Sequence, residues 1–149
     1  MKKRNISILF VVIAISSPFA HSSPWKKHIS GNGEDMWVLK SKPKIGSDGI
    51  VYAPFFDVNQ GDRQSEYSDP FGNKFKFDAT IRHVYMNCTK RQMALTTTEY
   101  YRDNALIYTE GNKFKSDRLS AKLGFNTLWT GVSFGSFYGK SYEYYCNGQ

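Results

Sequence analysis

The chain has 149 residues and a formal net charge of +7 at pH 7, a length that suits one domain with a single hydrophobic core. Three of its cations, Lys2, Lys3 and Arg4, lie in the first 22 residues, which contain no acid, so the charge of the remainder falls from +7 to +4. This charge argues against a dedicated nucleic-acid binder, which carries a denser basic stripe. It is compatible with weak attraction to anionic glycans or lipid headgroups.

Residues 1–22 have the parts of a secretory signal peptide. The cationic start is followed by an apolar run from Ile6 to Ile15 and by small residues around Ala20 and Ser22, the usual order of a signal and its cleavage site. The run is about half of the ~20 residues that cross a bilayer, so a permanent anchor is the weaker interpretation and no transmembrane segment is expected. Cleavage after Ala20 or after Ser22 fits, and no cysteine lies nearby to carry a lipid. We expect a signal peptide at 1–22 and one soluble domain at 23–149, periplasmic or secreted.

The first part of this domain predicts two short strands and a long loop. Apolar runs predict strands over 36–39 and 50–53, the second ending near Pro54, because proline cannot donate to a β-ladder. Residues 57–74 are polar and rich in turn residues. We therefore expect a long surface loop there, and such loops often carry recognition.

The clearest pattern predicts an antiparallel meander of three strands over 79–87, 91–101 and 105–109. These runs alternate or are rich in β-branched and aromatic residues, and polar turns separate them. Alternation in the first strand predicts two faces. One face carries Thr80, Arg82, Val84 and Met86, and the other carries Ile81, His83 and Tyr85.

The C-terminal region predicts a short strand over 128–132 and a final helix. Ser133 or Ser136 is a suitable N-cap for that helix. Tyr138, Tyr142 and Tyr145 follow an i, i+4, i+7 spacing, which places the three rings on one stripe. Gly139 would cost such a helix about 1 kcal/mol.

The two cysteines, Cys88 and Cys146, both lie in the part that would be exported. In an oxidising compartment this predicts one disulfide, worth roughly 4 kcal/mol in the chain-entropy model. A metal site is the alternative, but the usual Cys-x-x-Cys or Cys/His spacing is missing. The bond would tie the final helix to the strand of Cys88. The predicted fold class is α+β: an antiparallel β-sheet (meander) packed with a C-terminal helix and closed by one disulfide.

No catalytic constellation is recognisable. After cleavage at Ser22 the histidines are His28, expected in a flexible terminus, and His83, and neither is paired with a nucleophile by a known spacing. Because triads form in space, a hydrolase with His83 as its best candidate stays an alternative. The carboxylates between residues 57 and 78 match neither a calcium loop nor a glycosidase pair. We expect no enzyme, no catalytic residue, no metal and no cofactor.

The sequence Gly-Asn-Lys-Phe-Lys occurs twice, at 72–76 and at 111–115. On an exposed edge, it would offer cations to an acidic ligand and an aromatic face to a cationic or sugar ligand. The alternative, which we favour, is that Gly-Asn makes a turn, Phe faces the core and Lys protects an edge strand from aggregation. The candidate binding residues are Lys74, Phe75, Lys76, Lys113, Phe114 and Lys115.

A series of features follows along the meander and the tail. One strand ends at Cys88, the next ends in Tyr100-Tyr101, a short apolar strand leads to Gly111, and Trp129–Val132 leads through serines to Cys146. In this order the chain resembles the surface-adhesin protein E-like family of bacterial envelope proteins. The resemblance implies a sheet backed by a C-terminal helix and closed by the two cysteines, with adhesion or host-matrix binding as the function of its named member.

The chain departs from that family in three ways: it lacks a lipidation cysteine, its 57–77 loop is long and polar, and its final helix contains Gly139. Without a lipid anchor, a periplasmic location is favoured over surface display. Fold carries over better than function, and no ligand-contact residue transfers.

The leading functional hypothesis is an exported, non-enzymatic, adhesin E-like binding module whose partner is a protein or glycan of the envelope or host matrix. The alternative is a periplasmic inhibitor or immunity protein that blocks a hydrolase or toxin, with residues 58–72 as the plug. The sequence sets no oligomeric state.

Overall fold

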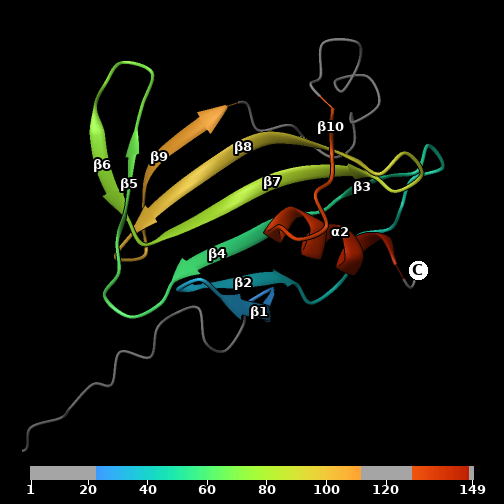
Figure 1. The fold of residues 1–149 in the computed structure, drawn as a ribbon, viewed down its shortest axis with the longest axis horizontal. Coiled ribbons are helices and arrows are strands. Elements are labelled where there is room, and N and C mark those ends of the chain that lie inside the picture. The colour runs from blue at the N-terminus through green and yellow to red at the C-terminus, as the bar shows by residue number, and fades with distance from the viewer. Residues whose placement is uncertain (1–22, 112–128, 148–149) are drawn as a thin grey trace, which may run out of the picture.

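The computed structural model describes residues 23–111 and 129–147, which form an antiparallel sheet with a helix on one face (Figure 1). The predicted signal peptide and the candidates Lys113, Phe114 and Lys115 lie outside these residues. The elements are β1 (Trp25–Gly31), β2 (Glu34–Leu39), β3 (Ile50–Tyr52), β4 (Phe55–Asn59), β5 (Ser65–Ser68), β6 (Lys74–Phe77), β7 (Ala79–Asn87), β8 (Gln92–Arg102), β9 (Ala105–Gly111), β10 (Thr130–Gly131) and α2 (Phe137–Cys146).

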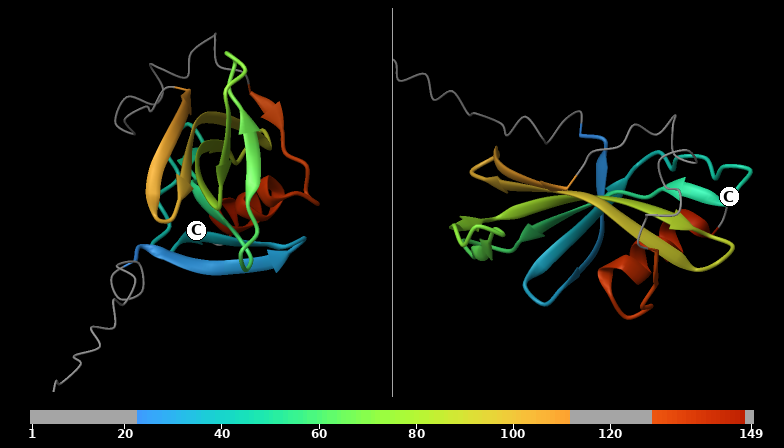
Figure 2. Two further views of the ribbon diagram at one scale, coloured as in Figure 1. Left: turned by 90° about the vertical axis from the view of Figure 1, so that its left-hand side faces the viewer. Right: turned by 90° about the horizontal axis from the view of Figure 1, so that it is seen from above.

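The main sheet has the order β1-β2-β4-β7-β8-β10, with β3 also paired to β7 and β9 also paired to β8. Strands β3 and β4 therefore occupy successive parts of the same edge of β7, as β9 and β10 do on β8. Figure 2 shows how strongly the sheet twists, so that β1 and β2 lie across the direction of β8 and β9. Strands β5 and β6 form a separate two-stranded hairpin.

The predicted meander is confirmed as β7, β8 and β9, with Ala79 opposite Tyr101 and Tyr100 opposite Tyr108. The predicted faces are confirmed too. Val84 and Met86 belong to the core beneath α2, whereas Ile81 lines a pocket together with Phe56 and Tyr101. Alternation along β7 separates these two environments.

The final helix is confirmed, and Ser136 is its N-cap, with the Ser136 hydroxyl accepting a hydrogen bond from the Gly139 amide at 3.2 Å. The tyrosine stripe faces the sheet. Tyr142 and Tyr145 are buried with β2, β3, β4 and β7 residues, and Tyr138 packs edge-on against Phe55. The Cys88–Cys146 disulfide is present, and it joins the last residue of α2 to the end of β7.

Gly139 has a packing role in the structure that its helix propensity does not reveal. A Cβ atom at this position would lie 2.4 Å from the Ser133 carbonyl oxygen and 2.5 Å from the Phe134 Cα. Because both obstacles are backbone atoms, glycine is required by the close approach of the segment that leads into α2.

Gly139→Ala is therefore expected to destabilise the protein by about 1–3 kcal/mol, the range for overpacking, although alanine is the better helix former. Gly135→Ala is the matched control, because a Cβ at Gly135 would meet nothing within 4 Å. Urea unfolding of both oxidised variants measures the difference. A Gly139→Ala protein as stable as Gly135→Ala would contradict the close approach.

Two expectations about the first half are wrong. Residues 57–74 are not one long loop, because β4 continues to Asn59 and the hairpin of β5 and β6 occupies most of the remainder. Pro54 separates β3 from β4 without ending the pairing with β7.

His28 does not lie in a flexible terminus but in β1, which pairs with β2 across the positive-φ turn Asn32-Gly33.

Candidate functional site

The β5–β6 hairpin projects beyond the main sheet, at the opposite end from α2 (Figure 1). Its strands pair from Ser65 opposite Phe77 to Ser68 opposite Lys74. The five residues between them form the tip, Asp69-Pro70-Phe71-Gly72-Asn73, which we call the hairpin tip.

Asp69 holds the hairpin tip in one conformation. Its Oδ1 atom accepts hydrogen bonds from the backbone amides of Phe71 at 2.9 Å and Asn73 at 2.8 Å, and its Oδ2 atom accepts one from the Asn73 side chain at 2.9 Å. These bonds lower the pKa of the Asp69 carboxyl, the Asn73 side chain being the largest cause. Gly72 has φ +85°, a conformation that a residue with a Cβ rarely adopts.

Phe71 is the most exposed large apolar side chain of the described residues, with 89% of its surface accessible. Exposed apolar residues are ordinary when they are scattered. Phe71 differs because a fixed turn presents it at the end of a projecting hairpin. An aromatic ring held in this way is suited to insertion into a concave apolar surface.

The base of the hairpin is anchored on the sheet by an aromatic cluster. The Tyr67 ring centroid lies 4.7 Å from that of Tyr100 and 5.8 Å from that of Tyr108. The Tyr67 hydroxyl donates to Glu110 at 2.6 Å, and this hydrogen bond is the main reason that the pKa of Tyr67 is raised to about 12. The Phe77 ring also packs edge-on against Tyr100. The hairpin is thus fixed at both its tip and its base.

The structure places the predicted binding residues of the first repeat on this hairpin. Phe75 packs in the aromatic cluster, with its ring centroid 5.0 Å from that of Tyr108. Lys74 and Lys76 are exposed, and the Lys74 ammonium lies 3.2 Å from the Glu66 carboxylate. The two lysines are therefore offset by Glu66 and Asp69 on the same hairpin, and Phe75 contributes to the anchoring of the hairpin. Gly111, which begins the second copy, ends β9.

A buried ion pair lies on the same face of the sheet as α2. Arg82 places a guanidinium nitrogen 3.1 Å from the Asp57 carboxylate, and its guanidinium also lies over the rings of Phe55 and Tyr138. Burial raises the pKa of Asp57 to about 7, with Arg82 opposing the shift. Arg82 thus connects Asp57 of β4 with Tyr138 of α2, which suits it to orienting the helix on the sheet.

His83 is buried on the opposite face of the sheet. Its Nδ1 atom is hydrogen-bonded to the Tyr52 hydroxyl, and its Nε2 atom lies 3.3 Å from a Glu99 carboxylate oxygen. Tyr52 and His83 also stack. Tyr52, His83 and Glu99 therefore form a buried polar network within the part of the chain that the structure describes. His28 lies against Tyr144, and burial lowers its pKa.

Within residues 23–111 and 129–147, no three His, Cys, Asp or Glu side chains come together as a potential metal site. In those same segments, no helix combines the length and the apolar character needed to cross a membrane.

The chain matches no family model, no characterised protein and no solved structure at a significant level. The functional conclusion therefore rests on the residues and geometry of this chain.

The exposure of Phe71 was missed from the sequence. The turn could be recognised in the sequence, because Asp69-Pro70 and Gly72-Asn73 are dipeptides typical of β-turns. The alternating Lys and Phe of β6 also indicated a strand. Together these two signals predict a hairpin, but only the packing around it decides that Phe75 points inward and Phe71 outward.

Proposed function

We propose that this chain is an exported, non-enzymatic binding module of the bacterial cell envelope that binds a protein partner through its hairpin tip. The single observation that carries the proposal is the combination of an 89% exposed Phe71 with a tip held by three hydrogen bonds from Asp69. Because these bonds fix the backbone that carries Phe71, the turn loses little backbone entropy on binding, which increases affinity.

The surroundings of the tip support a protein partner. Phe71 would act as the central anchor, and aromatic anchors that fill pockets carry much of the energy of protein interfaces. Glu66 and Asp69 balance the charges of Lys74 and Lys76 on the hairpin, so an apolar pocket for Phe71 is the main feature that a partner has to supply.

Export and envelope location are supported by the predicted signal peptide at 1–22 and by the Cys88–Cys146 disulfide, since disulfides persist in oxidising compartments. Kinship with the adhesin E-like family stays part of the proposal. It adds a host-matrix protein as one partner that the hairpin tip would recognise.

The second candidate is a periplasmic inhibitor or immunity protein. The projecting shape of the hairpin favours it, because a convex rigid loop suits the concave active site of a hydrolase or toxin. Deleting the predicted plug, residues 58–72, would remove β5 and leave β6 unpaired, so it would not separate the loss of a binding residue from the loss of the hairpin. A substitution at Phe71 is the appropriate change.

Phe71→Ser is expected to weaken partner binding by at least about thirtyfold, corresponding to about 2 kcal/mol for an anchor residue. Leu106→Ser is the control, because Leu106 is also exposed, at 54%, but lies on β9. Retention on immobilised extracellular-matrix proteins and inhibition of purified envelope hydrolases are measured side by side for the wild type and both variants at low salt.

Loss of one of these activities in Phe71→Ser alone supports the hairpin tip and identifies the class of partner. If the wild type shows neither activity, or if Phe71→Ser behaves like Leu106→Ser, the proposal is wrong.

A further inference from the structure

A second feature lies on the sheet face opposite α2 and the hairpin, and it is independent of the proposed function. It is a pocket of about 120 Å³. Three adjacent strands, β4, β7 and β8, line it with Phe56, Ile81 and Tyr101. In each strand, the next residue along the chain points to the other face of the sheet, toward α2 or the hairpin. The remaining lining residues are Trp25, Asp78, Ala79 and Asn104.

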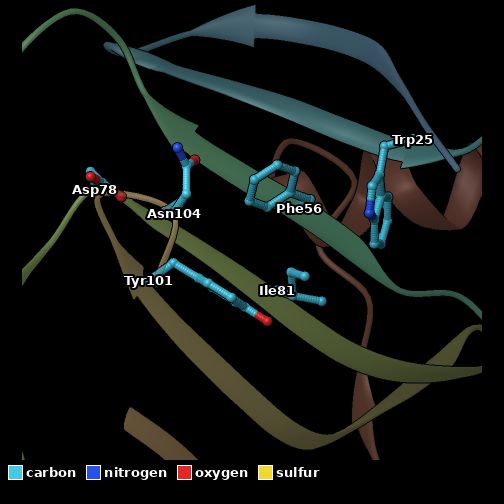
Figure 3. A pocket seen from close by; sticks show the side chains of 7 residues that line it. Trp25, Phe56, Asp78, Ile81, Tyr101 and Asn104 are labelled. Carbon is cyan, nitrogen blue, oxygen red and sulfur yellow. The ribbon is translucent and has the colours of Figure 1, made fainter. Parts of the chain in front are cut away.

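The pocket is apolar at one end and polar at the other. Figure 3 shows Trp25 at one end, Asp78 and Asn104 at the other, and Phe56, Ile81 and Tyr101 between them. The Tyr101 hydroxyl donates to Glu99 at 2.9 Å, so this residue offers chiefly its ring to the pocket.

The polar end carries negative charge in a fixed position. The Asp78 Oδ2 atom accepts a hydrogen bond from the Asp103 amide at 2.9 Å, which holds the carboxylate at the turn between β8 and β9. Asp78 and Asp103 also line an adjoining hollow together with Asp62 and Arg63. The Arg63 guanidinium donates to the Asn32 carbonyl at 3.0 Å and keeps its charge, but the three carboxylates outnumber this one cation.

We propose that this pocket binds a primary alkylammonium group. The alkyl chain would lie against Phe56, Ile81 and Tyr101, and the ammonium would donate hydrogen bonds to the Asp78 carboxylate. This arrangement places apolar surface against apolar surface and pairs opposite charges at the rim. The same chemistry is offered by a free aliphatic amine and by a lysine side chain of a protein, whose four-carbon stem ends in an ammonium.

The charge of the ligand head tests the proposal. Hexylammonium, hexanol and hexanoate have the same chain length and charges of +1, 0 and −1. Binding to the oxidised protein recovered after export is measured at pH 7 by NMR titration of the amides of Ala79 and Tyr101. Hexylammonium is expected to bind about tenfold more tightly than hexanol, the effect of one charged hydrogen bond, and hexanoate more weakly than both.

A lysine derivative blocked at both backbone ends is titrated in parallel. Saturable binding of hexylammonium alone indicates a free amine as the ligand, and binding of the lysine derivative indicates a side chain of a protein partner. If none of these ligands saturates the pocket, or if the three hexyl compounds bind equally, the inference is overturned.

Asp78→Asn is expected to remove the tenfold preference for hexylammonium over hexanol, because the amide oxygen still accepts the Asp103 N–H but no longer carries charge. Asp48→Asn is the matched control, since the Asp48 carboxylate also accepts a backbone amide, that of Ile50 at 3.0 Å, and does not line the pocket. A preference that survives in Asp78→Asn would contradict the role of Asp78. The ligand series on the wild type keeps the test decisive if this variant does not fold.

Discussion

Replacing Cys88 and Cys146 together with alanine is expected to lower the free energy of unfolding by about 4 kcal/mol. The disulfide closes a sequence separation of 58 residues, and a loop of that length corresponds to about 4 kcal/mol of lost entropy in the unfolded chain. The loss is large against the 5–15 kcal/mol that is typical of whole domains. Urea unfolding of the wild type and the double variant measures it.

Reduction provides the control for this prediction. The wild type in excess reductant is expected to unfold at the same urea concentration as the Cys88→Ala/Cys146→Ala variant, because both lack the same crosslink. An oxidised wild type that is no more stable than the double variant would show that the crosslink does not stabilise the native state.

Tyr145→Phe is expected to destabilise the protein by about 2–4 kcal/mol. The Tyr145 hydroxyl is buried, donates to the Pro54 carbonyl at 2.8 Å and accepts from the Leu39 amide at 2.8 Å. Its removal leaves a backbone acceptor and a backbone donor without this partner, and each buried group left unsatisfied costs about 1–3 kcal/mol. The single hydroxyl thus connects α2 to the end of β2 and to the break between β3 and β4.

Tyr144→Phe is the neighbouring control. The Tyr144 hydroxyl makes one hydrogen bond, to the Leu39 carbonyl at 2.8 Å, from a partly buried position, so its loss is expected to cost about 1 kcal/mol or less. Chemical denaturation of both variants with the disulfide intact compares them. Equal losses for the two substitutions would contradict the bridging role of Tyr145.

Both predictions concern the end of the sheet that α2 covers, whereas the hairpin is anchored at the other end. Tyr67 contacts Tyr100 and Tyr108 on β8 and β9, and Cys88 follows the far end of β7. The disulfide therefore acts on global stability, while Asp69 and the aromatic cluster fix the hairpin locally.

The parts of the fold that could be predicted from the sequence are those with strong local patterns. The meander over β7, β8 and β9 has long alternating or β-branched runs, and the spacing of Tyr138, Tyr142 and Tyr145 is that of one helix face. The pairing of Cys88 with Cys146 needed only the count of cysteines and the expected compartment. Each of these predictions needs only the pattern of one short segment or the number of cysteines, and no knowledge of tertiary contacts.

The parts that were missed depend on contacts between distant segments. β1 carries Lys26 and Lys27 on an edge strand, so it lacks an apolar run and shows only the Asn32-Gly33 turn as a signal. Glycine is needed at position 139 because the backbone of Ser133 and Phe134 lies against it. Helix propensities describe single residues and do not include such a tertiary contact.

The candidate site shows the same division. Turn residues and the alternation of β6 indicated the hairpin, but the polar composition of residues 57–74 suggested a loop instead. The exposure of Phe71 follows from the packing of Tyr67 and Phe75 against β8 and β9, which is a tertiary property. The pocket next to Asp78 likewise combines residues from β1, β4, β7 and β8.

Site-specific photo-crosslinking from the hairpin tip in exporting cells tests the central claim most directly. With a photoreactive phenylalanine at position 71, one partner protein is expected to be captured, and excess purified wild type is expected to compete for it whereas Phe71→Ser is not. The same photoreactive residue at position 106 is expected to capture nothing that the wild type displaces. Equal capture from both positions, or competition by Phe71→Ser as strong as that by the wild type, would contradict recognition through the tip.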